Sequence, residues 1–158
     1  MKKDDSLKKF KYKVAAFYNF ISIIDEEILL IKEELTNLAT NQKIKGTILL
    51  ASEGVNGTIC GTENSIAQFI ETLEKLLKVS DINVKYSWSE KQAFRRFKAR
   101  KKKEIVTIGL KQINPTKSVG KYIKAGEWNK FLEDPDSVVI DTRNEYEIKI
   151  GNFAGALN

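Results

Sequence analysis

Residues 48–61 limit the possible folds more than any other part of this chain. Their sequence is ILLASEGVNGTICG, in which two apolar, strand-like runs flank the dipeptides Glu53-Gly54 and Asn56-Gly57. Glycine adopts positive φ at little steric cost, and asparagine tolerates it better than most residues. The stretch therefore predicts a β-hairpin with a tight or bulged connection, whose arms are residues 44–51 and 55–61.

One amphipathic helix is predicted on each side of this hairpin. Upstream, Ser22 and Asp25 match a capping box, and Asn41 is a plausible stop. Downstream, Thr62 is a candidate N-cap, and Glu63 is favourably placed against the helix dipole. Apolar residues recur at helical spacing in both segments. The first stripe consists of Ile24, Ile28, Ile31, Leu35 and Leu38, and the second of Ile66, Phe69, Ile70, Leu73, Leu76 and Leu77.

A further strand is predicted beyond each helix. Residues 13–20 are short, aromatic and free of glycine and proline, whereas residues 82–88 alternate between apolar and polar side chains. The resulting order is strand–helix–strand–strand–helix–strand, with right-handed crossovers. We therefore predict an α+β, ferredoxin-like sandwich, a four-stranded antiparallel sheet with both helices on one face. Another small α/β arrangement of the same elements remains the alternative.

Histidine is absent from the 158 residues, and Cys60 is the only cysteine. These counts exclude Ser-His and Cys-His nucleophile pairs, imidazole metal sites, internal disulfides and multi-thiolate metal sites within the sequence. We accordingly predict no metal site and no disulfide-linked partner. Cys60 is interpreted as a small buried hydrophobe, the alternative being a thiol whose pKa is lowered by the helix that follows it.

Apolar runs in the sequence are all shorter than the roughly 18–20 residues that a membrane-spanning helix requires. The basic start is not followed by the apolar region of a signal peptide. We therefore expect a cytoplasmic protein with no membrane partner. The sequence leaves the oligomeric state open.

Positive charge is concentrated in one segment, residues 91–103, which we call the basic segment. It holds eight of the basic residues that produce the net charge of +6 and no acidic residue, so the rest of the chain carries −2. Lysine and arginine neutralise phosphates, while aromatic faces stack unpaired bases. Phe94 and Phe97 interleave with these cations, and Tyr86 and Trp88 precede them. The candidate RNA-binding residues are Arg95, Arg96, Lys98, Arg100, Lys101, Lys102 and Lys103.

A solvated connecting segment is the alternative interpretation of the same charges. In either case, we expect Phe94 and Phe97 to be anchored in the core.

The rest of the chain predicts a strand at 104–110, a linker at 111–126, a short helix at 128–132, a turn at Asp134-Pro135-Asp136 and a short apolar strand at 138–140. An apolar strand of this kind usually lies inside an α/β sheet. No further core follows it, which indicates an incomplete second domain. The predicted organisation is a disordered tail at 1–12, a ferredoxin-like domain at 13–90, a basic segment with strand and linker at 91–126, and the start of a second domain at 127–158.

Two groups of motifs resemble a known family. Residues 140–147 (IDTRNEYE) and 150–156 (IGNFAGA) resemble the opening strand, Asp-x-Arg element and glycine-rich return of a rhodanese domain. Residues 53–59 (EGVNGTI) and 102–107 (KKEIVT) are similar to the N-terminal region of the bacterial tRNA uridine hydroxylase family. In that family, a ferredoxin-like domain precedes a rhodanese domain. The resemblance extends from about residue 13 to residue 158.

The resemblance implies oxygen-dependent 5-hydroxylation of the wobble uridine, with tRNA as partner and molecular oxygen as co-substrate; no other cofactor is identified. The family's essential cysteine lies in the rhodanese loop, beyond the segment that matches Gly155-Ala156, and Cys60 does not match it. No catalytic residue is therefore assigned, and we expect this chain alone to be inactive. Asp141 and Arg143 match the Asp-x-Arg element, where their role is to cap loops and brace the fold.

Two other functions remain as alternatives, and a third is disfavoured. Rhodanese domains commonly transfer sulfur, so a sulfurtransferase is the alternative enzyme, and a non-catalytic RNA-binding or interaction module is the alternative outside enzymes. An acylphosphatase is disfavoured, because no glycine-rich phosphate loop with a following arginine lies between Phe20 and Asp25.

Overall fold

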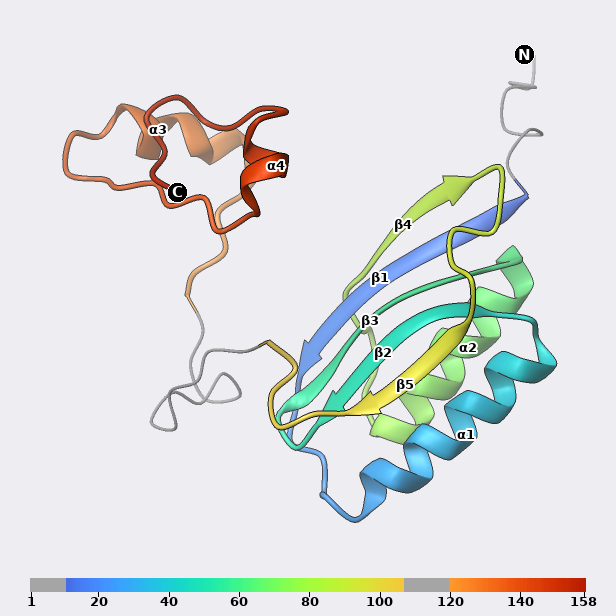
Figure 1. Ribbon diagram of the computed structural model, residues 1–158. Coiled ribbons are helices and arrows are strands. Elements are labelled where there is room, and N and C mark those ends of the chain that lie inside the picture. The colour runs from blue at the N-terminus through green and yellow to red at the C-terminus, as the bar shows by residue number, and fades with distance from the viewer. Residues whose placement is uncertain (1–10, 107–119) are drawn as a thin grey trace, which may run out of the picture. The chain divides into compact units, whose positions relative to one another are not determined.

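The computed structural model describes residues 11–106 and 120–158. The chain divides at residue 120 into two compact units, which are described separately. Within residues 11–106, the first unit contains five strands and two helices (Figure 1). In chain order they are β1 (Tyr12–Phe20), α1 (Glu27–Asn41), β2 (Lys45–Ala51), β3 (Gly54–Gly61), α2 (Glu63–Leu77), β4 (Val84–Ser89) and β5 (Phe97–Lys101).

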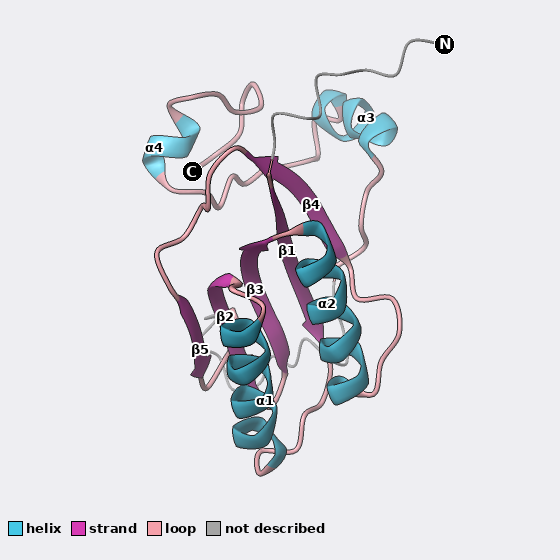
Figure 2. Cartoon of the chain, turned by 90° about the vertical axis from the view of Figure 1, so that its right-hand side faces the viewer, coloured by secondary structure: helices cyan, strands magenta, loops and turns pink. Residues whose placement is uncertain are grey.

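The five strands form one sheet in the order β4-β1-β3-β2-β5. The pairs β4–β1, β1–β3 and β3–β2 are antiparallel, whereas β5 runs parallel to β2. Both helices lie on the same face of this sheet (Figure 2). The ferredoxin-like α+β fold predicted from the sequence is confirmed, with one strand more than the predicted four in the sheet.

The fifth strand lies earlier than the extra strand predicted at 104–110. Residues 104–106 are not in a strand, and residues 107–110 lie outside the described residues. The observed strand falls inside the basic segment, and Phe97 and Ala99 are the apolar residues of its inward-facing half, which also includes Lys101. Charged side chains, especially lysine, are typical of an edge strand because they discourage pairing with other chains.

The hairpin between β2 and β3 is closed by a two-residue connection, Ser52-Glu53. Gly54 has φ of 143°, and a Cβ there would lie 2.0 Å from the carbonyl oxygen of Asn19, so the position requires glycine. The prediction of a tight connection is confirmed. The turn signal at Asn56-Gly57 was wrong, because both residues lie inside β3 and pair with β1 and β2.

Helix α1 begins at Glu27, later than the capping box at Ser22 and Asp25 predicts, and no side chain caps it. The preceding segment is instead bound to the hairpin, because the amides of Ile21 and Ile23 donate to the carbonyl oxygens of Glu53 and Ser52 at 3.0 and 2.9 Å. Backbone groups used in this way are not available for a helical turn. Ile24 therefore leaves the predicted apolar stripe and is 60% exposed.

Helix α2 begins as predicted, since the Oγ1 atom of Thr62 accepts a hydrogen bond from the amide of Ser65 at 3.3 Å. No helix within the described ranges combines the length and the apolar character needed to cross a bilayer.

The core lies between the sheet and the two helices. Phe69 of α2 is fully buried there, and its ring meets that of Phe97 edge-on, with centroids 5.9 Å apart. Phe97 thus packs against the core, as predicted. Phe94 does not belong to this cluster. Other fully buried members are Ile28, Leu35, Ile48, Leu50, Val55, Ile59, Ile66 and Leu73.

The second unit contains α3 (Trp128–Glu133) and α4 (Glu145–Ile148). Helix α3 confirms the predicted short helix, and the amide of Ser137 donates to the carbonyl of Asp134 at 3.1 Å in the predicted turn. The predicted strand at 138–140 is reduced to one parallel bridge between Ile140 and Leu157. None of residues 120–158 is buried, so this unit has no closed apolar core of its own.

Candidate nucleic-acid interface

Charge is separated between the sheet and the helices of the first unit. The strands carry basic side chains and no acidic one. Helices α1 and α2 are mainly acidic. The basic residues of the strands are Lys13, Lys45, Lys85, Lys98, Arg100 and Lys101; the acidic residues of the two helices are Glu27, Glu33, Glu34, Glu63, Glu71 and Glu74, against Lys32 and Lys75.

The strand cations point to two different faces. Lys13 and Lys101 lie on the helix side, where their Nζ atoms pair with the carboxylates of Glu63 and Asp25. The other four strand cations lie on the opposite face, which we call the open face. Within the described ranges, none of those four takes part in an ion pair. They are Lys45, Lys85, Lys98 and Arg100.

The strand positions that face this side follow from the two-residue alternation of a β-strand and from the pairing register. None of them is acidic, so no neighbouring carboxylate on the strands neutralises the four cations. Besides these cations, the open-face positions include Val14, Ala16, Tyr18, Thr47, Leu49, Asn56, Thr58 and Ser87.

A hollow of about 510 Å³ lies on the open face where β2 and β5 meet. Thr47 lies on β2, and the loop before β5 contributes Phe94, Arg95 and Arg96, with Lys98 from the strand itself. Its volume falls within the range of about 300–1,000 Å³ typical of ligand pockets. We call this the basic hollow. Three cations and one half-buried aromatic ring therefore surround a space large enough for a nucleotide-sized group.

The loop that carries the basic hollow is held to the sheet by its backbone. The amide of Gly46 donates to the carbonyl oxygen of Arg96 at 3.1 Å, and the amide of Ala93 donates to the Sγ atom of Cys60 at 3.5 Å. Cys60 is fully buried under this loop, which confirms its interpretation as a small buried hydrophobe.

Phe94 is not the core anchor that the sequence predicts. It is half-buried and lines the basic hollow together with the open-face residue Thr47. The three-residue spacing between Phe94 and Phe97 suggested a common environment. Because β5 begins only at Phe97, the loop before it is free to place Phe94 on the other side of the sheet.

The structure divides the predicted RNA-binding residues among three places. Arg95, Arg96 and Lys98 line the basic hollow, and Arg100 lies on the open face beside Leu49. Lys101 points to the helix side and pairs with Asp25. Lys102 and Lys103 follow the end of β5 and are exposed.

Two aromatic residues that precede the basic segment are separated from it by the sheet. Tyr86 and Trp88 lie on the helix side of β4, where the Nζ atom of Lys13 is 4.6 and 5.4 Å from their ring centroids. These two residues are close to the cations of the basic hollow in sequence but lie on the opposite side of the sheet. The open-face residues Lys45, Thr47 and Lys85 were missed, because only the strand register brings them to the same face.

The hairpin holds the chain just beyond the end of the basic segment. The Oε1 atom of Glu53 accepts a hydrogen bond from the amide of Ile105 at 2.7 Å, and the Nδ2 atom of Asn56 donates to the carbonyl oxygen of Ile105 at 3.2 Å. The side chain of Ile105 is buried, although it does not belong to the main core cluster. We call these two contacts the Ile105 clamp. They explain why glutamate and asparagine flank Gly54 and Val55 in the hairpin.

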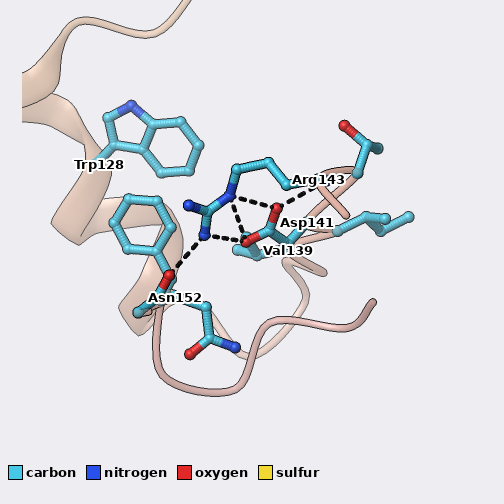
Figure 3. Close-up of a pocket in the computed structure, with 9 residues that line it drawn as sticks. Trp128, Val139, Asp141, Arg143 and Asn152 are labelled. Atoms are coloured by element: carbon cyan, nitrogen blue, oxygen red, sulfur yellow. Dashed lines mark hydrogen bonds and ion pairs between the residues drawn. The ribbon is translucent and has the colours of Figure 1, made fainter. Parts of the chain in front are cut away.

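A second hollow, of about 480 Å³, lies in the second unit (Figure 3). The rings of Trp128 and Phe153 stack on one side of it, with centroids 5.0 Å apart. Asp141 and Arg143 form a bidentate pair on the other, with an Nη2–Oδ2 distance of 2.7 Å.

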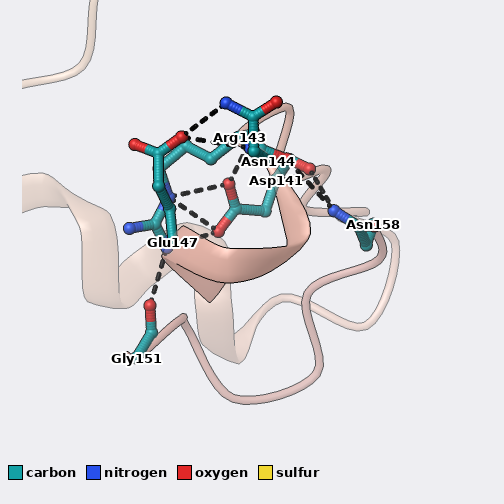
Figure 4. A network of polar contacts seen from close by, with 6 residues as sticks. All are labelled: Asp141, Arg143, Asn144, Glu147, Gly151 and Asn158. Carbon is teal, nitrogen blue, oxygen red and sulfur yellow. Dashed lines mark hydrogen bonds and ion pairs between the residues drawn. The ribbon is translucent and has the colours of Figure 1, made fainter. Parts of the chain in front are cut away.

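Arg143 also donates to the carbonyl oxygen of Gly151 at 2.7 Å, and Asn158 donates to that of Asp141 at 3.3 Å (Figure 4). These bonds tie three loop segments together, as expected of residues that brace the fold.

Removing the guanidinium of Arg143 is expected to raise the pKa of Asp141. Hydrogen bonds from the side chain and the amide of Arg143 hold this pKa below its ordinary value. A lowered carboxyl pKa contributes stability that is present above the unfolded-state pKa, about 3.9, and is lost as the pH falls through the folded-state pKa. A carboxyl ¹³C NMR titration of the Arg143→Ala variant should show Asp141 titrating at higher pH than in the unmodified chain.

Lys149→Ala is the matched control for this titration, because it removes one exposed cation from the same unit without touching Asp141. It should leave the midpoint unchanged. Identical midpoints in the unmodified chain and Arg143→Ala would contradict the assignment of the shift to Arg143.

No cluster of three or more histidine, cysteine, aspartate or glutamate side chains suited to a metal ion is found in residues 11–106 and 120–158.

A family model and several named proteins match this chain. The model described as "UPF0176 acylphosphatase like domain" matches residues 12–105. Proteins named tRNA uridine(34) hydroxylase from Prochlorococcus marinus strains NATL2A and MIT 9303 are 95% and 47% identical over 158 and 155 residues, and one from Synechococcus sp. strain CC9605 is 47% identical over 150 residues. The matches cover 100%, 98% and 92% of this chain and 50%, 50% and 46% of those proteins. The chain thus spans about half the length of these relatives.

Among solved structures, an acylphosphatase from Coxiella burnetii matches 59% of this chain and 96% of its own, with 18% identity and a TM-score of 0.42. An acylphosphatase from Bacillus subtilis matches 58% and 98%, with 20% identity and a TM-score of 0.40.

Proposed function

Since the chain belongs to the UPF0176 acylphosphatase-like domain family, we propose that it is the tRNA-binding portion of a tRNA uridine(34) hydroxylase. The binding surface is the open face together with the basic hollow. In the complete enzyme, which acts in the cytoplasm, the reaction replaces the hydrogen at C5 of the wobble uridine by a hydroxyl group. Molecular oxygen supplies the oxygen atom, and a two-electron donor reduces the second oxygen atom to water.

The reactive thiol of this enzyme is assigned to a rhodanese-type domain that begins within the second unit. Two observations support the assignment of the thiol to that domain and of tRNA binding to this chain. Cys60 is fully buried, and the chain contains no other cysteine. Asp141 and Arg143 are engaged with each other and with Gly151, as bracing residues are. This chain therefore contributes binding and orientation.

The observation that carries the proposal is the separation of charge between the two faces of the first unit. Lysines and arginines on the open face release counterions when they neutralise phosphates, which is the main source of affinity for nucleic acids. The carboxylates on the helices repel the same phosphates. The field of the domain therefore favours approach of RNA to the open face and opposes its approach to the helix side.

An acylphosphatase activity is not supported by the loop between β1 and α1, where that chemistry is expected. Phosphate binding in such loops relies on free backbone amides. Here, the amides of Ile21 and Ile23 donate to the hairpin carbonyls of Glu53 and Ser52. Ile23 is also buried.

Replacing Arg95, Arg96 and Arg100 together by alanine should weaken tRNA binding about 10-fold to 100-fold, because three exposed charge contacts are lost. The slope of log affinity against log salt should fall by about 2–3, given about 0.7–0.9 per phosphate contact. Fluorescence anisotropy with a labelled tRNA transcript carrying uridine at position 34, titrated at several salt concentrations, measures both quantities.

The matched control removes three cations from the helix side, by Lys32→Ala, Lys75→Ala and Lys78→Asn. Asparagine is chosen at position 78 because Lys78 has φ of 56°, which asparagine tolerates. This variant has the same net charge as the first and should bind tRNA with the affinity and slope of the unmodified chain. Equal losses in the two variants would reduce the proposal to an effect of net charge.

A further inference from the structure

One row of open-face residues crosses all five strands of the sheet. Lys98 of β5 pairs with Thr47, Thr47 with Thr58, Thr58 with Ala16, and Ala16 with Lys85 of β4. Neighbouring strands lie about 4.7–4.9 Å apart, so the two terminal lysines are separated by about 19 Å at their Cα atoms. The row therefore has a cation at each edge and three small side chains between them.

Each end of this row opens into a hollow. The Lys98 end is the basic hollow. A smaller hollow of about 160 Å³ covers the rest of the row, because Thr58, Ala16 and Lys85 all line it. Neither hollow is lined by an acidic side chain. Lys85 is exposed and lies outside the basic segment, so its position at the far end of the row is a property of the folded sheet alone.

Unpaired RNA matches this surface better than a duplex does. In a duplex, the base faces are covered by their neighbours, so a half-buried ring such as Phe94 has no base to stack on. A single strand offers phosphates and free base faces together, and base–aromatic stacking is largely independent of sequence. Thr47 lines the basic hollow, and Thr58 and Ala16 line the smaller one, so the two hollows together follow the row. The small side chains of these three residues leave room for a strand to lie flat along it.

We propose that the open face is a track for single-stranded RNA, which runs from the basic hollow along this row to Lys85. Phe94 stacks one unpaired base at the first end, and Lys85 holds a phosphate at the second. This inference rests on the proposed function and adds to it the kind of RNA bound and its path across the sheet.

The test uses the complete 158-residue chain and three labelled probes: oligouridylates of about 4 and about 12 nucleotides, and a 12-base-pair RNA duplex. Single-strand sites of this type typically take about 4–16 nucleotides. Lys85→Ala should weaken binding of the longer oligouridylate about two-fold to five-fold and reduce its salt slope by about 0.7. Binding of the shorter probe, which occupies the basic hollow alone, should not change.

Phe94→Ala should weaken binding of both oligouridylates about 5-fold to 100-fold, with little change in salt slope, because it removes stacking and no charge. Its effect on the duplex should be absent. Lys75→Ala, which removes one cation from the helix side, is the control for Lys85→Ala. Circular dichroism melting checks that Lys85→Ala and Phe94→Ala remain folded, as expected for residues outside the core cluster.

The outcomes separate this inference from the proposed function. If Lys85→Ala leaves binding of the longer probe unchanged while the triple arginine variant loses it, the track is wrong and tRNA binding stands. Equal effects of Phe94→Ala on the single strands and the duplex would overturn the preference for unpaired RNA. If the unmodified chain binds none of the probes and no tRNA, both proposals fail together.

Discussion

Replacing Gly46 by alanine is expected to lower the free energy of unfolding of the first unit by about 2–6 kcal/mol. Gly46 has φ of 140°, a backbone conformation that side chains other than glycine rarely adopt. A Cβ there would lie 2.2 Å from the carbonyl oxygen of Thr58 and 2.6 Å from the Cα of Ile59. Backbone strain of about 1–3 kcal/mol and overpacking of about 1–3 kcal/mol add together, because neither neighbour is a side chain that can rotate away.

The same substitution should also disturb RNA binding, because the backbone shift that it forces displaces the amide of residue 46, which holds the carbonyl oxygen of Arg96. Urea unfolding followed by far-ultraviolet circular dichroism measures the change in stability. Gly126→Ala is the control, since a Cβ at Gly126 meets no atom within 4 Å. Indistinguishable unfolding midpoints for the two variants would show that β2 and β3 are not packed at Gly46 as described.

Replacing Phe69 by alanine should lower the free energy of unfolding by about 3–5 kcal/mol, the usual range for a buried phenylalanine. Phe69 is fully buried on α2 and meets the ring of Phe97 edge-on. The cavity left behind would lie under the start of β5, so this strand loses its only aromatic contact with the core among those described. Chemical unfolding of the variant, monitored by circular dichroism, measures the loss.

Phe131→Ala serves as the comparison, because Phe131 is 42% exposed in the second unit. It should change the unfolding of the first unit little. The pair of variants also tests the different placements of Phe94 and Phe97, since Phe94→Ala should behave like Phe131→Ala in unfolding and unlike it in RNA binding. A large loss of stability in Phe94→Ala would place Phe94 in the core after all.

The helices and the overall order of elements were predictable because they depend on local patterns. The stripe from Ile66 to Leu77 and the Thr62 cap describe α2 without reference to the rest of the fold. The start of α1 was not predictable in this way. The competing partners of Ile21 and Ile23 are hairpin carbonyls that lie 32 and 29 residues away in sequence. Tertiary hydrogen bonds there overrode a valid local signal at Ser22 and Asp25.

The predictions of the extra strand and of a turn at Asn56-Gly57 were wrong for related reasons. In β5, cations occupy three of five positions, so the apolar half of the alternation is too short to stand out. Asn56-Gly57 is a common turn dipeptide, yet Asn56 is used for its side chain, which binds Ile105. Gly57 lies between the buried side chains of Phe17 and Ile48, where a Cβ would be crowded.

The candidate site was predictable only in part. A run of cations in sequence identified Arg95, Arg96, Lys98 and Arg100, but it also included Lys101, which the alternation of β5 turns toward Asp25. Lys85 is separated from Lys98 by a loop and faces it across the sheet only through the pairing of five strands. Residues that share a face of the sheet only through the pairing register cannot be grouped from the sequence before that register is known.

The Ile105 clamp should strengthen the binding of RNA to the basic segment. Ordering one residue of backbone costs about 1–2 kcal/mol of conformational entropy. The bonds from Gly46 to Arg96 and from Glu53 and Asn56 to Ile105 fix the backbone on either side of the cations of β5. Its entropy is therefore lost when the chain folds, and a ligand meets cations that are already preorganised. Glu53 lines neither hollow, yet its bond to Ile105 can in this way strengthen binding to the sheet beside it.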